Sequence, residues 1–164
     1  MMSLPYHDPA EDDGLLRHFY RDWRPTRLAK IHNGLWAWVS GLGLLPPIVL
    51  TLRTRDRSSG SLNSTVLAPV DYNGQRYLVS MLGQGSQWVQ NARAAGGEAF
   101  IKRGQTRRVV LVEIPILERA PILKAWCQVA KSGRRHLPVP PDAPITAFEA
   151  IARNYPVFRI DPAT

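Results

Sequence analysis

The sequence predicts a mainly β protein of the α+β class, an antiparallel or mixed barrel of about six strands with helices inserted between them. Short apolar runs rich in β-branched residues recur from residue 47 onward, as at residues 48–52 and 109–114. Asn73-Gly74 stands between two such runs and is the strongest hairpin signal in the chain. With 164 residues, 45% of them hydrophobic, the chain is long enough for one domain with a core.

The first part of the chain, residues 1–46, is interpreted as an arm and helices that pack on a barrel formed by residues 47–164. Apolar and aromatic residues recur at helical spacing over residues 15–23 and 27–38, with Pro25 between the two segments. This aromatic pattern favours core or interface packing over a ligand platform. Residues 33–52 are uncharged, but Pro46-Pro47 would break a membrane-spanning helix, so we predict a short helix and then a buried strand.

Strands and loops alternate through the next fifty residues. We predict strands at residues 48–52, 64–72 and 75–82, with a loop rich in arginine and serine between the first two. A glycine-rich segment, GQGS, then leads into a helix over residues 87–95. Ser86 is predicted to cap this helix, and Gly96-Gly97 to end it.

The last third of the chain predicts a second hairpin, two helices and a closing strand. Residues 99–102 and 106–114 form the hairpin around Gly104, and Pro121 stands in the first turn of the next helix. Residues 131–144 are proline-rich and typical of a loop that covers a site. A short helix over residues 146–153, with Glu149 at a capping-box position, precedes a strand at residues 155–160.

The charge predicts an anionic partner, since the net charge is +8 and the chain contains 21 lysines and arginines. The basic residues form no run of five or more, and no stripe of alternating aromatic and basic residues appears, so we expect no nucleic acid partner.

The single cysteine, Cys127, excludes an internal disulfide framework and a cysteine metal site, which fits a reducing cytoplasm. Residues 1–13 are acidic and lack the apolar core of a signal peptide. We expect a cytoplasmic protein, with peripheral contact to the inner face of the membrane as a minor alternative.

Two loops are candidates for an anion site. Three arginines at positions 53, 55 and 57 precede Ser58, Ser59 and Gly60, and together they supply fork-shaped donors and hydroxyls for phosphate or carboxylate oxygens. Gly83 and Gly85 allow backbone to approach a ligand closely, and the helix that follows would point its first N–H groups toward the same region. Both loops could therefore face one cleft. No HExxH, GxSxG, Walker A or CxxC motif is present, which leaves a cofactor to carry any chemistry.

Residues 47–95 resemble the deazaflavin-dependent nitroreductase family, split β-barrel proteins that use coenzyme F420. The matching motifs are PIVLTLRT, RSSG, the Asn73-Gly74 turn and WVQNARAAG, where family members typically show WYxNLxANP. Trp88, Asn91 and Ala94 match that pattern in register. The resemblance continues at residues 98–114 and 155–160, and thus covers roughly the last two-thirds of the chain. It implies a six-stranded split β-barrel with flanking helices, similar to the FMN-binding split barrels.

The resemblance implies that the phosphate and acidic tail of the cofactor lie on the arginine loop, and its ring along residues 80–85 and the start of the Trp88 helix. Many members have Lys where this chain has Ser58 and Arg where it has Asn63, and Arg53 and Arg55 could compensate. The implied contact residues are Arg55, Arg57, Ser58, Ser59, Gly60, Asn63, Ser80, Met81, Gly83, Gly85, Ser86, Gln87, Trp88 and Asn91.

The implied activity is hydride transfer from reduced coenzyme F420 to a quinone, a nitroaromatic compound or another conjugated acceptor such as an enone. Alternatives are an FMN-binding split-barrel oxidoreductase, a protein that binds the deazaflavin without catalysis, and a basic nucleic-acid-binding module. Some members have tyrosines before the final strand, where this chain has SGRRHLPVPP, so His136 is the candidate proton donor. A solvated basic loop, with solvent as the donor, is the alternative there. A homodimer also remains open.

Overall fold

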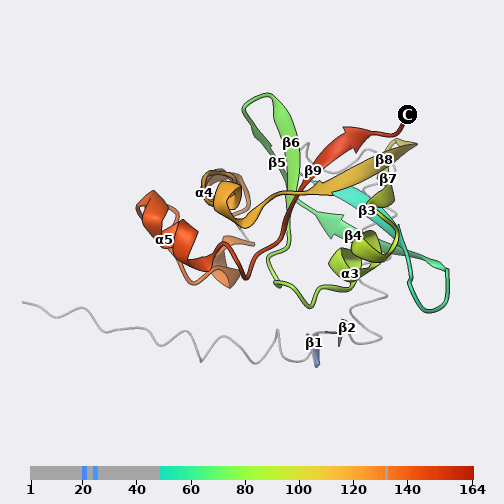
Figure 1. Cartoon of the computed structure of the whole chain (residues 1–164), viewed down its shortest axis with the longest axis horizontal. Helices are drawn as coiled ribbons and strands as arrows, with labels where there is room; N and C mark the ends of the chain where they lie inside the picture. Colours follow the sequence, from blue (N-terminus) through green and yellow to red (C-terminus); the bar gives the residue numbers. More distant parts are fainter. Residues whose placement is uncertain (1–19, 22–23, 26–48, 132) are drawn as a thin grey trace, which may run out of the picture.

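The computed structural model describes residues 20–21, 24–25, 49–131 and 133–164, and its main body is one antiparallel sheet with helices around it (Figure 1). The sheet has seven strands in the order β4-β3-β7-β8-β9-β6-β5. Its strands are β3 (Leu50–Arg55), β4 (Leu62–Leu67), β5 (Pro69–Tyr72), β6 (Gln75–Val79), β7 (Glu98–Arg103), β8 (Gln105–Glu113) and β9 (Val157–Pro162). The helices are α3 (Gln87–Ala94), α4 (Arg119–Val129) and α5 (Ile145–Ile151), with single 3₁₀ turns at η1 (Ile116–Glu118) and η2 (Arg134–His136).

The sheet curls because its two edge strands are neighbours in the chain. β4 and β5 stand at opposite ends of the strand order, yet only Ala68 separates them. The edges must therefore approach each other at Ala68, where the indole Nε1 of Trp126 donates to the Ala68 carbonyl at 2.9 Å. The predicted barrel is confirmed in its coarse form, a curled antiparallel half-barrel. It has seven strands rather than six because the strand predicted over residues 64–72 divides before Pro69, whose backbone has no N–H to donate.

Both predicted hairpins are present. Asn73 and Gly74 have φ angles of 48° and 74°, the left-handed pair that a tight two-residue hairpin loop requires, and they join β5 to β6. Gly104, with φ of 73°, turns the chain between β7 and β8. These local signals therefore set the register of two of the sheet's strand pairs.

The core is divided between two layers. One cluster fills the inside of the curl, where α3 packs against β3, and there Trp88 and Phe158 meet with ring centroids 5.4 Å apart. The other lies between the β5–β6 pair and the α4–α5 pair, which sits at the left of the sheet in Figure 1. Trp126, Leu123, Phe148 and Val157 are central to this second cluster. The glycine-rich segment between β6 and α3 runs from one layer to the other.

Two local predictions were wrong. Pro144, not Thr146, precedes the first turn of α5, so Glu149 is not at a capping-box position. Tyr20–Arg21 (β1) pairs with Arg24–Pro25 (β2), so these residues are extended although a helix was predicted over residues 15–23. The remainder of the predicted N-terminal arm and helices lies outside the described residues. Within the described ranges, no helix is long and apolar enough to cross a membrane.

Candidate functional site

A cleft of about 360 Å³ opens where the glycine-rich segment faces η2 and the segment just before β9. The structure thus brings together four residues that the sequence singled out separately: Met81, Gly83, Gly85 and His136. The other lining residues are Leu82, Gln84, Asn154 and Tyr155. The proline-rich loop was predicted to border the site, and its first turn, η2, forms one wall of this cleft.

Two buried serines fix the glycine-rich side of the cleft. The hydroxyl of Ser80 lies 2.8 Å from the carbonyl of Gly83 and 2.7 Å from the hydroxyl of Ser86. Ser86 does precede the first turn of α3, but its side chain makes no capping hydrogen bond, so the prediction of a serine cap was wrong. Its hydroxyl bonds to Ser80 instead. The first N–H groups of α3 are therefore left to other acceptors.

Gly83 and Gln84 connect the two sides of the cleft. Gly83 has a φ of 78°, and a Cβ at this position would lie 3.1 Å from the carbonyl oxygen of Asn154. Only glycine combines that left-handed conformation with so close a contact. The amide of Gln84 donates to the carbonyl of Arg153 at 2.6 Å. The glycine-rich segment and the segment before β9 are thus held against each other.

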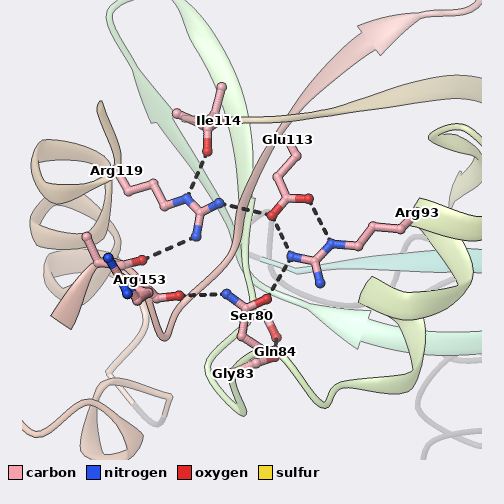
Figure 2. Close-up of polar contacts among 9 residues, drawn as sticks. Ser80, Gly83, Gln84, Arg93, Glu113, Ile114, Arg119 and Arg153 are labelled. Carbon is pink, nitrogen blue, oxygen red and sulfur yellow. Dashed lines mark hydrogen bonds and ion pairs between the residues drawn. The ribbon is translucent and has the colours of Figure 1, made fainter. Parts of the chain in front are cut away.

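A charged network behind Gln84 joins α3, β8 and α4. Figure 2 shows the carboxylate of Glu113 between the guanidinium groups of Arg93 and Arg119. Arg93 binds both oxygens of Glu113, at 2.8 and 2.6 Å, and also donates to the Gln84 side chain at 2.7 Å. Arg119 donates to Glu113 at 3.0 Å and to the carbonyls of Ile114 and Ala152. The hydrogen bond from Arg93 is the main reason that the pKa of Glu113 is lowered.

Tyr155 was missed by the sequence reasoning, although it stands on the wall opposite the glycines. Its hydroxyl donates to the backbone carbonyl of His136 at 3.1 Å, which ties η2 to the segment before β9. Burial raises the pKa of Tyr155, so the phenol keeps its proton at neutral pH. A tyrosine in front of Pro156 gave no signal by itself, because only the fold brings the segment before β9 to the cleft.

Asp56 is the second residue that the sequence reasoning missed, and it organises the arginine loop. Its carboxylate accepts from the backbone N–H groups of Ser58 and Ser59, both at 2.9 Å, and from the Ser59 hydroxyl at 3.2 Å. The side-chain amides of Asn63 and Gln87 donate to its other oxygen at 3.0 and 2.9 Å. These bonds, led by the one from the Ser59 N–H, hold the pKa of Asp56 well below its usual range. An internal carboxylate therefore occupies several donors that were assigned to a phosphate.

The two loop arginines keep donors for a ligand. Arg57 bonds through its backbone N–H and one guanidinium nitrogen to the Asn91 side-chain oxygen, at 3.3 and 3.1 Å. Arg55 donates from one nitrogen to the Gly60 carbonyl at 2.9 Å. Both side chains are exposed, so their remaining N–H groups face solvent. Asn91 is fully buried, and its side-chain nitrogen has no hydrogen-bond partner among the described residues.

The arginine loop and the glycine-rich segment both contact α3, and the described residues that line the cleft beside η2 include none from the arginine loop. Gln87 and Asn91 of α3 touch the arginine loop, whereas the glycine-rich segment ends at the residue before α3. Trp88, which lies between Gln87 and Asn91 in the helix, is only 5% exposed and packs in the core inside the curl. Of the predicted contact residues on α3, Trp88 and Asn91 are thus buried.

The described part of the chain holds no group of three or more histidine, cysteine, aspartate or glutamate side chains that could bind a metal ion. Cys127 is buried in the second core cluster, and burial raises its pKa. The polar groups that line the cleft are backbone groups, the side chains of His136 and Tyr155, and the amides of Gln84 and Asn154.

No family model and no curated protein matches the chain. Several solved structures do match the chain. A structure described as a domain-swapped dimer aligns with a TM-score of 0.51 and 15% identity, over 82% of this chain and 96% of that one. An F420-H2 dependent reductase aligns with a TM-score of 0.50 and 19% identity, over 71% of this chain and 96% of that one. A putative 5-nitroimidazole antibiotic resistance protein from Bacteroides thetaiotaomicron aligns at 0.45 and 13% identity, over 85% and 81%.

At these identities the first two matches show a shared fold. The expected split β-barrel is thereby confirmed, since this chain has the architecture of an F420-H2 dependent reductase over nearly the whole length of that protein.

Proposed function

We propose that this protein is an oxidoreductase that transfers a hydride from reduced coenzyme F420 to a quinone, a nitroaromatic compound or another conjugated acceptor. The observation that carries the proposal is the cleft between the glycine-rich segment and the His136–Tyr155 wall. It lies in a fold shared with an F420-H2 dependent reductase, which supports the choice of cofactor. The protein is basic, as suits a cofactor with a phosphate and an acidic tail.

The hydrogen-bond donors that are not already used within the protein fit the anionic part of such a cofactor. The N–H groups at the start of α3 are not capped by Ser86, and Arg55 and Arg57 keep exposed donors. An anionic group would be held by these, with the Ser58 hydroxyl, rather than by Ser59, Asn63 and Gln87, which bond to Asp56. The backbone of residues 81–85 would lie along the ring. When bound, the reduced deazaflavin supplies the hydride.

The chain's own contribution is to orient the reactants and provide a proton. Met81 and Leu82 give the cleft an apolar side that excludes water, and Gly83 lets the backbone approach a planar group closely. A quinone or nitro group that gains a hydride becomes an anion and needs a proton. His136 lines the cleft and is the donor we propose, while Tyr155 positions η2 through the His136 carbonyl.

Titration of the purified full-length chain with coenzyme F420 and with FMN, followed by fluorescence, tests this function. We expect saturable binding of coenzyme F420. Arg55→Ala with Arg57→Ala should weaken it by about 2–4 kcal/mol, two charge-assisted contacts discounted for exposure. Arg103→Ala with Arg107→Ala, which removes two exposed arginines from the β7–β8 hairpin, is the matched control. Tighter binding of FMN would favour a flavin enzyme instead, and no binding of either compound would refute the proposal.

A homodimer is part of the proposal, because a protein of the same fold is described as a domain-swapped dimer. The turn η1 offers apolar side chains for such contact, since Leu117 is 94% exposed and Ile116 is 42% exposed. Sedimentation analysis of the chain and of a Leu117→Ser variant tests this part on its own.

A further inference from the structure

A second hollow, of about 470 Å³, also includes residues of η2, but its lining shares no residue with the cleft and has a different chemistry. One wall carries the cations Lys131, Arg134 and Arg135. The other wall is residues 137–141, made of leucine, valine and prolines. We call this feature the basic hollow. His136 lies in the sequence between Arg135 and Leu137, which line the basic hollow, but it lines the cleft instead.

The cations of the basic hollow are not neutralised within the described chain. None of its ion pairs includes Lys131, Arg134 or Arg135. The only acidic residue between positions 131 and 144, Asp142, does not line the hollow. Three like charges close together repel one another, and a bound anion would relieve that repulsion. Two of the three residues are arginines, whose forked donors match the oxygens of carboxylate or phosphate.

Both walls are fixed before any ligand arrives. Side-chain donors from α4 hold the apolar wall: Gln128 bonds to the Pro141 carbonyl and Lys124 to the Ala143 carbonyl, each at 2.9 Å. Leu137 and Val139 anchor the same wall in the second core cluster. The cationic wall is held by the Arg134 N–H, which donates to the Ala130 carbonyl at the end of α4 at 2.8 Å. A preformed site loses little entropy on binding.

We propose that the basic hollow binds an amphipathic organic anion, a phosphate or carboxylate group joined to an apolar chain. The cations would hold the oxyanion, and the exposed rings of Pro138 and Pro140 would lie against the apolar part. An inorganic ion would use only one of the two walls. This site is independent of the proposed reductase activity, because none of its lining residues lines the cleft.

Calorimetric titration of the full-length chain with octyl phosphate, below its micelle concentration, tests the proposal. We expect saturable binding that is roughly tenfold or more tighter than that of inorganic phosphate, because the apolar wall contributes. Lys131→Gln with Arg135→Gln should weaken octyl phosphate binding by roughly tenfold or more, since both side chains are exposed and their loss spares the core. Arg134 is left unchanged because its charge also acts on buried Cys127.

The matched control is Arg103→Gln with Arg107→Gln, which removes the same charge from the β7–β8 hairpin and should bind octyl phosphate like the parent. Equal weakening in both double variants would overturn the site, and so would inorganic phosphate that binds as tightly as octyl phosphate. Sedimentation with vesicles that contain phosphatidylglycerol distinguishes a membrane lipid from a soluble amphiphile as the ligand. Vesicle binding lost only in Lys131→Gln with Arg135→Gln supports a lipid, and octyl phosphate binding without vesicle binding supports a soluble amphiphile. Absence of both kinds of binding refutes the proposal.

Discussion

The hydroxyl of Tyr155 donates a hydrogen bond to the backbone carbonyl of His136 over 3.1 Å, and both residues line the same cleft. This bond joins the first turn of the proline-rich loop to the segment before β9, two parts of the chain that are nineteen residues apart. It therefore fixes the wall that faces the glycine-rich segment.

Tyr155→Phe should loosen that wall without removing the phenyl ring from its packing. A hydrogen bond of this kind contributes about 0.5–1.5 kcal/mol to the free energy of unfolding, so we expect a loss near 1 kcal/mol in urea denaturation. The KM for a quinone acceptor should rise, while the affinity for coenzyme F420 changes little. A Phe variant with unaltered stability and unaltered KM would show that the bond does not position η2.

Glu113→Gln should destabilise the protein, because Arg119 has a side chain only 6% exposed and relies on this carboxylate. We expect a loss of about 1–2 kcal/mol at neutral pH, less than for a fully buried pair since Glu113 is partly exposed. Glu98→Gln is the matched control. It breaks the exposed pair with Arg108 and should cost at most about 0.5 kcal/mol. Equal losses in urea denaturation of the two variants would contradict the role given to the network.

Ionisation of Asp56 should make the free energy of unfolding depend on pH in the acidic range. Its folded pKa is depressed by hydrogen bonds from Ser59, Ser58 and Gln87, so its contribution is complete above the unfolded pKa near 4 and is lost as the pH falls further. Asp56→Asn should therefore be less stable than the parent at neutral pH and lose less stability on acidification below about pH 4. Urea midpoints measured from neutral pH to below pH 4 give the change of stability with pH for the parent and for the variant. Parallel slopes would mean that the carboxylate does not order the loop.

Local signals predicted much of the fold, and non-local contacts explain what they missed. Asn73-Gly74, the helix of Trp88 and the β7–β8 hairpin depend on residues close in sequence, and all three are present. The predicted strand divides before Pro69, but the curl that brings the two sheet edges together at Ala68 also involves Trp126, 58 residues away. A pattern read along the chain cannot include such a contact.

The candidate site divides in the same way. The glycines and His136 were singled out by residue type, and the structure places them in one cleft. Asp56 was overlooked because an acidic residue inside a basic loop gives no motif, although its role follows from five donors that converge on it. Ser86 was expected to cap α3 but bonds to Ser80, a partner defined only by the fold.

His136→Gln should reduce turnover with a quinone while leaving the affinity for coenzyme F420 intact. Glutamine keeps the size and polarity of the side chain but has no group that titrates near neutral pH. Turnover rates of both proteins, compared between about pH 6 and 8, separate a donor from a bystander. Equal rates throughout would leave solvent as the source of the proton.

Gly85→Leu offers the most direct test that the cleft holds the deazaflavin ring. Gly85 is exposed, lines the cleft and is not among the residues with a positive φ, so leucine should fold normally while filling the space. Thr106→Leu, an exposed position on the β7–β8 hairpin, controls for the added apolar side chain. The measurement is a fluorescence titration of coenzyme F420 against the parent and both variants, with melting temperatures recorded alongside. We predict unchanged melting temperatures and loss of cofactor binding in Gly85→Leu alone; binding of coenzyme F420 to a folded Gly85→Leu variant with the affinity of the parent would contradict the account.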